Sequence, residues 1–200
     1  MRFLLPVGGQ VDDRFAGILT TPGMYGIAAG ITAGLPWAAD NQAFTKGFDA
    51  GRFFPWLASM EPYRERCLFV TVPDVVGDAV ATMTNWRLWQ HLFNGWPLAF
   101  AAQDGQEDLP LPVGYDVLFV GGSTEWKESP AAISVIKRAQ AAGKRIHIGR
   151  VNWWRRYRLF RQIAGSEEFT CDGTRQRFEG IERAKAAWAD YQRRPVMALW

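Results

Sequence analysis

Cysteine and histidine are scarce in this sequence, which excludes several classes of site. Its two cysteines, Cys67 and Cys171, are too few for a disulfide scaffold or a cysteine-based zinc site. Its two histidines, His91 and His147, cannot complete a zinc ligand set of the usual composition. We therefore expect no zinc centre. The simplest role of each cysteine is that of a small buried hydrophobic residue.

Long hydrophobic runs are also absent. No apolar stretch approaches the roughly 20 residues of a membrane-spanning helix. The first ten residues, MRFLLPVGGQ, contain one arginine and too short an apolar stretch for a secretory signal. Neither the dinucleotide-binding pattern GxGxxG nor a P-loop occurs, so phosphate binding through those loops is excluded. We expect a cytoplasmic protein with no membrane partner.

Acidic residues are missing between Ser129 and Ser166, although cations are frequent there. In the stretch WWRRYRLFR the cations alternate with aromatic residues, a composition that attracts nucleic-acid phosphates. An ordinary solvated helix face has the same composition, so both interpretations stay open. The candidate phosphate contacts are Lys144, Arg145, Arg155, Arg156 and Arg158.

Short apolar runs that end in polar or glycine residues alternate with helix-like segments. The runs are RFLLPVG, GLPWAAD, CLFVTVPD, PLAFAAQD, YDVLFVGG, RIHIGR and EEFTCD, with a less regular one at 26–31. Parallel strands need crossover helices, so this alternation predicts an α/β fold with a parallel sheet. Seven or eight strands in 200 residues favour a compact (β/α)8 TIM-like barrel over an open sheet. We expect one domain over residues 1–200.

Capping residues mark the ends of the expected helices. Asp78 precedes a helix over 79–93, and Ser129 with Pro130 begins one that ends before Gly143. Asn152 is the expected N-cap of a helix over 153–164, and a last helix covers 181–192. The helix over 153–164 has an inner stripe of Trp153, Tyr157, Phe160 and Ala164.

Polar residues follow most of the expected strands, where a barrel collects its catalytic groups. They are Asp40, Asp74, Gln103, Asp104, Gly121, Gly122, Arg150, Asn152 and Asp172. Converging carboxylates repel one another unless they share protons or bind a ligand rich in donors, such as the edge of guanine. Each residue taken alone could be an ordinary turn or cap residue. As a set they predict a substrate site.

The stretch FTCDGTR (169–175) contains both a thiol and a carboxylate. Cys171 lacks a histidine or metal partner to activate it, because His147 within RIHIG is most simply a strand residue. The same lack of a histidine partner makes Ser123 a poor hydrolase nucleophile. Asp172 is therefore the reactive candidate in this stretch.

Five stretches carry a resemblance to a known family: DNQAF (40–44), VPDVVGD (72–78), FAAQDG (100–105), LFVGGSTEWK (118–127) and FTCDGTR (169–175). In this order the series resembles the queuine/archaeosine tRNA-guanine transglycosylase superfamily. It is most similar to the shorter phage and bacterial relatives that place 7-deazaguanines in DNA. The order and the strand-end placement carry the resemblance, and they imply the same barrel fold.

The resemblance also implies a role for each matching residue. Asp172 would be the nucleophile and Asp40 the general acid/base. Asp74 and Gln103 would bind the purine edge, and the backbone of Gly121 and Gly122 would contact the base. We expect Arg150 and Asn152, at another strand end, to contact the substrate as well.

The sequence departs from the tRNA enzymes at three points. Asn41 and Gln42 stand in place of Ser and Gly, and Asp172 comes two residues later than the Asp of their FDCVMPTR-like stretch. Their zinc-binding subdomain is missing, which favours DNA over tRNA as the polymer. The implied reaction is a double displacement at C1′, in which a 7-deazaguanine replaces guanine through an Asp172 ester. It needs no metal or redox cofactor, and the target nucleotide is flipped out of a duplex.

Other functions stay open at this point. An N-glycosylase or a nucleoside deoxyribosyltransferase would use the same pair of Asp residues. A non-catalytic nucleic-acid-binding barrel, or a metabolic enzyme that does not bind nucleic acid, would use the same fold. A homodimer or a partner protein is equally compatible with the sequence.

Overall fold

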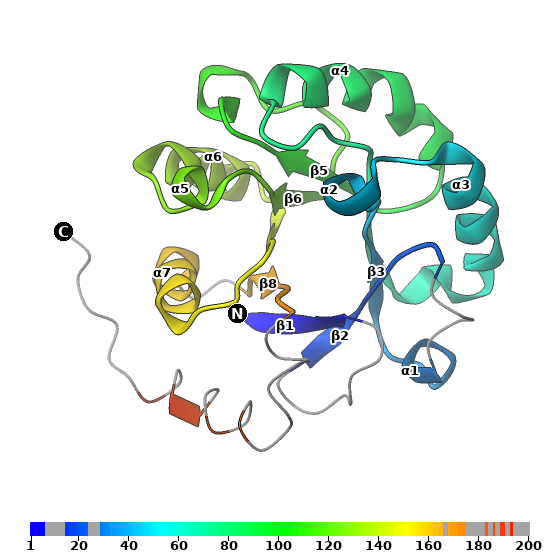
Figure 1. Ribbon diagram of the computed structural model, residues 1–200, viewed down its shortest axis with the longest axis horizontal. Helices are drawn as coiled ribbons and strands as arrows, with labels where there is room; N and C mark the ends of the chain where they lie inside the picture. The colour runs from blue at the N-terminus through cyan, green and yellow to red at the C-terminus, as the bar shows by residue number, and fades with distance from the viewer. Residues whose placement is uncertain are drawn as a thin grey trace.

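Eight parallel strands close into a barrel in the order β1 to β8, with β8 paired to β1. This computed structural model describes residues 1–6, 15–23, 29–165 and 168–174, together with Arg183, Ala186, Ala189, Asp190 and Arg193. The described helices lie around the outside of the strands (Figure 1). The chain is therefore an α/β protein with a closed barrel, compatible with a TIM-like fold.

The strands are β1 (Arg2–Pro6), β2 (Phe15–Thr20), β3 (Trp37–Ala39), β4 (Cys67–Thr71), β5 (Leu98–Ala102), β6 (Val117–Val120), β7 (Arg145–Ile148) and β8 (Thr170–Cys171). The α-helices in the described part are α1 (Ala29–Thr32), α2 (Ala43–Lys46), α3 (Ala50–Ser59), α4 (Ala79–Trp89), α5 (Thr124–Lys127), α6 (Pro130–Ala141) and α7 (Trp154–Ala164). Short 3-10 helices are η1 (Glu61–Arg66), η2 (Gln90–Phe93) and η3 (Gln106–Asp108). None of the helices in the described ranges has the length and apolar character needed to cross a bilayer.

Alternate residues of each strand face opposite sides of the barrel wall. One buried cluster consists of strand residues alone, among them Leu4, Phe69 and Val117, and it fills the interior of the barrel. The larger cluster joins the other strand residues to the helices, as with Ile146 of β7 and Ile136 of α6. A strand residue's place in this alternation therefore decides whether it reaches the interior or packs under a helix.

One expected strand was wrong and another was missed. Residues 29–32, which overlap the end of the run expected as a strand at 26–31, form helix α1. The strand that completes the barrel is β2, which carries the sequence FAGILT and is almost entirely buried. A buried strand gives a continuous apolar pattern rather than alternation, and here its glycine and alanine weakened that pattern.

The capping predictions were right at two helices and wrong at a third. Asp78 accepts from the backbone N–H of Ala81 at 2.9 Å, and Ser129 caps α6. The N-cap of α7 is Trp153 rather than Asn152, so this helix begins one residue later than expected. Trp153 is 58% exposed and does not join the buried stripe of α7. The helix expected over 181–192 lies outside the described residues, apart from isolated positions.

Candidate active site

A cavity of about 600 Å³ lies at the carboxyl ends of the strands. The eight residues expected to act on substrate all line this mouth cavity: Asp40, Asp74, Gln103, Gly121, Gly122, Arg150, Asn152 and Asp172. Asp104, which also follows a strand, is not among the lining residues. Both of its carboxylate oxygens accept from Ser123, one from the backbone N–H at 2.7 Å and one from the hydroxyl at 2.5 Å. Asp104 thus holds the loop after β6.

Asp40 follows β3 directly, and its backbone N–H donates to Thr20 of β2 at 2.9 Å. One carboxylate oxygen accepts from the backbone N–H of Gln42 at 3.0 Å. Burial raises the pKa of Asp40 to about 6, and the negative charges of Asp172 and Asp74 act in the same direction. Asp40 can therefore hold and release a proton near neutral pH, as a general acid/base requires.

Asp74 is held by two amide side chains. Asn41 Nδ2 donates to Oδ1 at 2.8 Å, and Gln103 Nε2 donates to Oδ2 at 2.6 Å. Burial raises the pKa of Asp74, and the hydrogen bond from Asn41 opposes that rise. Asn41 is itself 3% exposed and also donates to the carbonyl of Val72. The sequence showed Asn41 only as a departure from Ser, and its role as a support for Asp74 was missed.

Gln103 is fixed in one orientation. Its Oε1 accepts from the backbone N–H of Gly77 at 3.0 Å and of Gly122 at 2.8 Å, which leaves Nε2 for Asp74. The glycine pair after β6 makes this approach possible. A Cβ on Gly121 would lie 2.5 Å from Nε2 of Gln103, and Gly122 has a φ of 64°. The Gly-Gly turn is required by this close packing.

Asp172 binds two donors from β7 and the turn that follows it. Its Oδ1 accepts from the backbone N–H of Arg150 at 2.9 Å, and its Oδ2 lies 3.1 Å from Nε2 of His147. Nδ1 of His147 lies 2.9 Å from the Thr170 hydroxyl. If that hydroxyl donates to Nδ1, Nε2 carries the proton and donates to Asp172. A carboxylate with two donors is held in one position, as a nucleophile must be.

His147 was expected to be a strand residue without a role in the site. It is a strand residue, but its neighbours Ile146 and Ile148 pack outward and its ring faces the interior between Phe69 and Phe119. The alternation within RIHI was the signal that could have placed it. Cys171 faces the other way and is fully buried, and burial raises the pKa of its thiol, so packing is its role.

Arg150 closes one side of the mouth cavity. It has a φ of 61°, and its guanidinium donates to the carbonyl of Gly122. The guanidinium carbon also lies 4.3 Å from the ring centre of Phe44, a cavity-lining residue that is 61% exposed. Phe44 is a further site residue that sequence reasoning missed, although it lies within the quoted DNQAF stretch.

The five candidate phosphate contacts do not form one surface. Arg155 is exposed and Arg158 partly exposed on α7, whose first turn follows the mouth-side end of β7. Arg156 has a side chain only 8% exposed and pairs with Glu128 at 2.8 Å, so it does not face solvent as a phosphate contact must. Lys144 and Arg145 lie at the start of β7, at the opposite end of the barrel, where Arg145 donates to the carbonyl of Leu68. These two residues cannot contact a substrate at the mouth.

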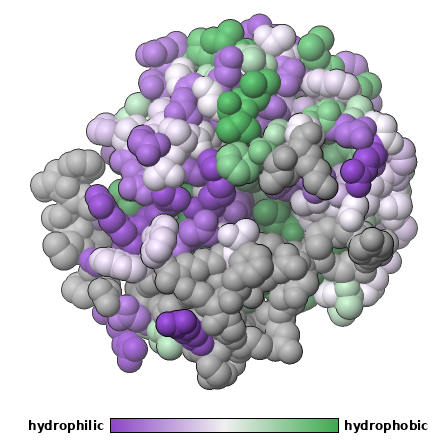
Figure 2. All heavy atoms as spheres, viewed as in Figure 1, coloured by the Kyte–Doolittle hydropathy of each residue, from purple (hydrophilic) through white to green (hydrophobic). Residues whose placement is uncertain are grey.

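The surface around the barrel carries two kinds of side chain on the face drawn in Figure 2. Hydrophilic side chains gather over α5, α6 and α7, and a strip of hydrophobic ones runs from the edge near α4 toward the centre. Several exposed apolar residues follow strands: Val75, Val76 and Trp153 lie in loops, Phe44 lies in α2, and Trp154 begins α7. A mouth with apolar and cationic borders suits a ligand that has both planar bases and phosphates.

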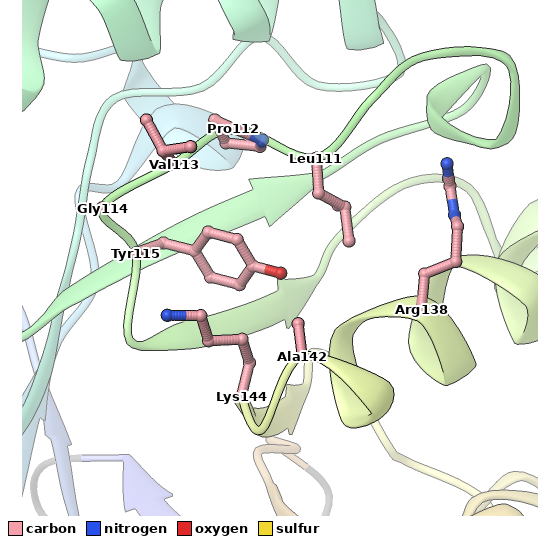
Figure 3. A pocket seen from close by; sticks show the side chains of 8 residues that line it. All are labelled: Leu111, Pro112, Val113, Gly114, Tyr115, Arg138, Ala142 and Lys144. Atoms are coloured by element: carbon pink, nitrogen blue, oxygen red, sulfur yellow. The ribbon is translucent and has the colours of Figure 1, made fainter.

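A second, more open cavity of about 520 Å³ lies away from the mouth, between the loop before β6 and the start of β7. The side chains of Tyr115, Arg138 and Lys144 border it (Figure 3). The ammonium of Lys144 lies 5.1 Å from the centre of the Tyr115 ring, and Arg138 donates to the carbonyls of Leu109 and Gln106. Both cations thus have partners, and no carboxylate from the described residues lines this cavity.

No protein-family model, curated protein or solved structure matches the chain. Among the described residues, no three side chains of His, Cys, Asp or Glu are grouped so as to hold a metal ion. The function must therefore be argued from the site itself.

Proposed function

We propose that the protein is a base-exchange transglycosylase that replaces guanine in DNA with a 7-deazaguanine. The observation that carries this proposal is the pair of carboxylates in the mouth cavity. Asp172 is held by donors from Arg150 and His147, whereas the pKa of Asp40 is raised to about 6 by burial. Two carboxylates in different environments suit a nucleophile and an acid/base at one anomeric carbon.

The reaction proceeds in two displacements. An oxygen of Asp172 attacks C1′ of the nucleotide, the glycosidic bond breaks, and the proton of Asp40 goes to the departing guanine. The product is an ester between C1′ and Asp172. The incoming 7-deazaguanine then attacks C1′ from the face that guanine left, its ring N–H proton returns to Asp40, and the Asp172 carboxylate is released. Configuration at C1′ is retained.

The base-binding wall consists of Asp74, Gln103 and the Gly121–Gly122 backbone. Asp74 still has lone pairs for the N–H groups at a guanine edge, because each oxygen accepts only one amide hydrogen bond. The Phe44 ring and the Arg150 guanidinium lie at the border of the same cavity, where a planar base can stack. Asn152 also lines the cavity.

The polymer is proposed to be DNA, with tRNA the weaker alternative. Arg155 and Arg158 on α7 are positioned to contact phosphates beside the mouth, and exposed Trp153 offers a surface for neighbouring bases. We take the chain as one (β/α)8 domain over residues 1–200 without a zinc subdomain, acting in the cytoplasm. A homodimer or a partner protein remains compatible with this arrangement.

The test is incorporation of a labelled 7-deazaguanine into guanine-containing DNA, with release of an equal amount of guanine. A protein that instead leaves abasic sites when no base is added is an N-glycosylase. One that transfers the label only between free nucleosides is a deoxyribosyltransferase. DNA binding without any turnover identifies a non-catalytic barrel, and no DNA binding at low salt excludes a nucleic-acid substrate.

A further inference from the structure

Lys127, the last residue of α5, is fully buried, and the steps proposed above do not use it. Its ammonium donates to the carbonyl of Gly149 at 2.9 Å, directly after β7. Burying a lysine charge costs several kcal/mol unless it is compensated. A residue with only a packing role would be apolar here, so the charge at this position needs an explanation.

Charged groups from four neighbouring segments act on Lys127. Burial lowers its pKa to about 7, and Arg150 and Arg156 lower it further, whereas Asp172 and Asp104 oppose the change. The two carboxylates follow β8 and β5, and the two arginines belong to the turn after β7 and to α7. The protonated form is thus favoured by the same Asp172 that the proposed reaction uses as its nucleophile.

The segment that Lys127 binds is the one that holds Asp172. The Gly149 carbonyl accepts from Lys127, and the Arg150 carbonyl accepts from Arg156 at 2.7 Å. The N–H between these two carbonyls, that of Arg150, donates to Asp172 Oδ1. Arg150 has a left-handed backbone, which a non-glycine residue keeps only where its surroundings fix it.

We infer that Lys127 is a positioning residue for Asp172. Its ammonium fixes the Gly149–Arg150 turn so that the Arg150 N–H points at the carboxylate. This inference rests on the proposed function for the nucleophilic role of Asp172, although the positioning itself is a property of the structure. Asp172 in turn has three supports: His147 on β7, the Arg150 N–H in the turn after it and, less directly, Lys127 on α5.

Lys127→Met should release the turn without placing a polar group in the core. A displacement of about 1 Å at a reacting group costs roughly 100-fold in rate, so we expect kcat for base exchange to fall about 10- to 100-fold. KM for the free base should change less than kcat, because Asp74 is held by Asn41 and Gln103 rather than by the Gly149–Arg150 turn. Lys127→Arg keeps the charge and should recover part of the rate. Lys137→Met, on the exposed face of α6, is the matched control.

The closing experiment measures amide hydrogen exchange and the amide resonance of Arg150 alongside base exchange. We expect the Arg150 amide to exchange at least about tenfold faster in Lys127→Met and to be unchanged in Lys137→Met. Unchanged protection together with unchanged kcat in Lys127→Met overturns the inference. If the wild-type protein exchanges no base, the proposed function fails, and the amide measurements still decide the role of Lys127.

If Lys127→Met does not fold, the inference can be tested by titrating a protein that keeps Lys127. In an Asp40→Asn background, which removes the nearby carboxyl whose pKa is raised to about 6, the Arg150 amide resonance should shift as Lys127 loses its proton, with a midpoint pKa of about 7. Lys127→Arg should abolish that shift, because arginine stays charged. An Arg150 resonance that does not change across this range contradicts the inference.

Discussion

His147 Nε2 lies 3.1 Å from Asp172 Oδ2, and the histidine that makes this contact is completely buried inside the barrel. The imidazole packs at a tilt against the rings of Phe69 and Phe119, which prevents it from turning away. Asp172 is therefore held from the interior by a side chain and from the rim by the Arg150 N–H. The proposed nucleophile is positioned before any substrate binds.

Replacing His147 tests this support. His147→Phe keeps an aromatic ring of similar size and removes the donor to Asp172. A hydrogen bond to a charged group contributes about 1.5–3 kcal/mol, so kcat for base exchange should fall roughly 10- to 150-fold. His91→Phe, at an exposed position of η2, is the control and should leave the rate unchanged. Equal rates for His147→Phe and wild type would remove His147 from the mechanism.

Asp40 should reduce stability in a pH-dependent way. Its pKa of about 6 lies above the ordinary 3.8, so the folded protein binds this proton more tightly than the unfolded chain does. The stability that this bound proton contributes is fully present below about pH 4 and is lost as the pH rises to about 6. Above that pH the folded protein holds a buried charged carboxylate, which lowers the free energy of unfolding. Asp40→Asn should therefore raise the free energy of unfolding by about 1–3 kcal/mol at about pH 8, and by nothing at about pH 4. It should also abolish base exchange.

Urea unfolding of both proteins at the two pH values measures the difference. The matched control is Asp108→Asn, at an exposed position of η3. Equal stability of Asp40→Asn and wild type at the higher pH would show that the Asp40 carboxyl is not held in a costly environment.

Gln103→Glu should weaken base binding. The substitution replaces the amide that donates to Asp74 at 2.6 Å with a second carboxylate, and like charges at this distance repel. The affinity for guanine should fall at least about tenfold, equivalent to about 1.4 kcal/mol. Calorimetric titration with guanine measures it, and Gln162→Glu on the exposed side of α7 is the control. An unchanged affinity would exclude this wall as the base site.

Substitutions of two arginines at opposite ends of the barrel distinguish a direct phosphate contact from the effect of overall positive charge on DNA binding. Arg155→Ala, beside the mouth, should weaken binding of all DNA sequences and reduce the salt dependence of log Kd by about one unit of slope. Arg145→Ala, at the far end, removes the same charge and should change neither quantity. Matching effects of the two substitutions would mean that DNA does not bind at the mouth.

The barrel could be predicted from the sequence because buried strands and capped helices leave local patterns. Asp78 and Ser129 cap helices where expected, and the runs after Pro36, Arg66 and Pro97 are strands. Strand β2 was missed because its apolar residues are interrupted by Gly17. That glycine is needed because a Cβ would lie 2.4 Å from the Pro36 carbonyl oxygen, a contact no local pattern reveals.

The candidate site was predictable in its carboxylates but not in their partners. Strand ends place Asp40, Asp74 and Asp172 together in any parallel barrel. Which side chains donate to them depends on neighbouring strands, as with His147, or on a loop that folds back, as with Asn41. Arg156 was expected to be exposed because it lies in a basic helix. Its side chain is instead buried and donates to the carboxylate of Glu128.

The most direct test of the central claim compares wild type with Asp172→Asn in the transfer of labelled 7-deazaguanine into guanine-containing DNA. The wild-type protein should incorporate label and form an ester that mass spectrometry locates on the peptide containing Asp172. Asp172→Asn should form no ester and lose at least about 1,000-fold in rate, because it lacks the nucleophile. Full label transfer by Asp172→Asn would contradict the account.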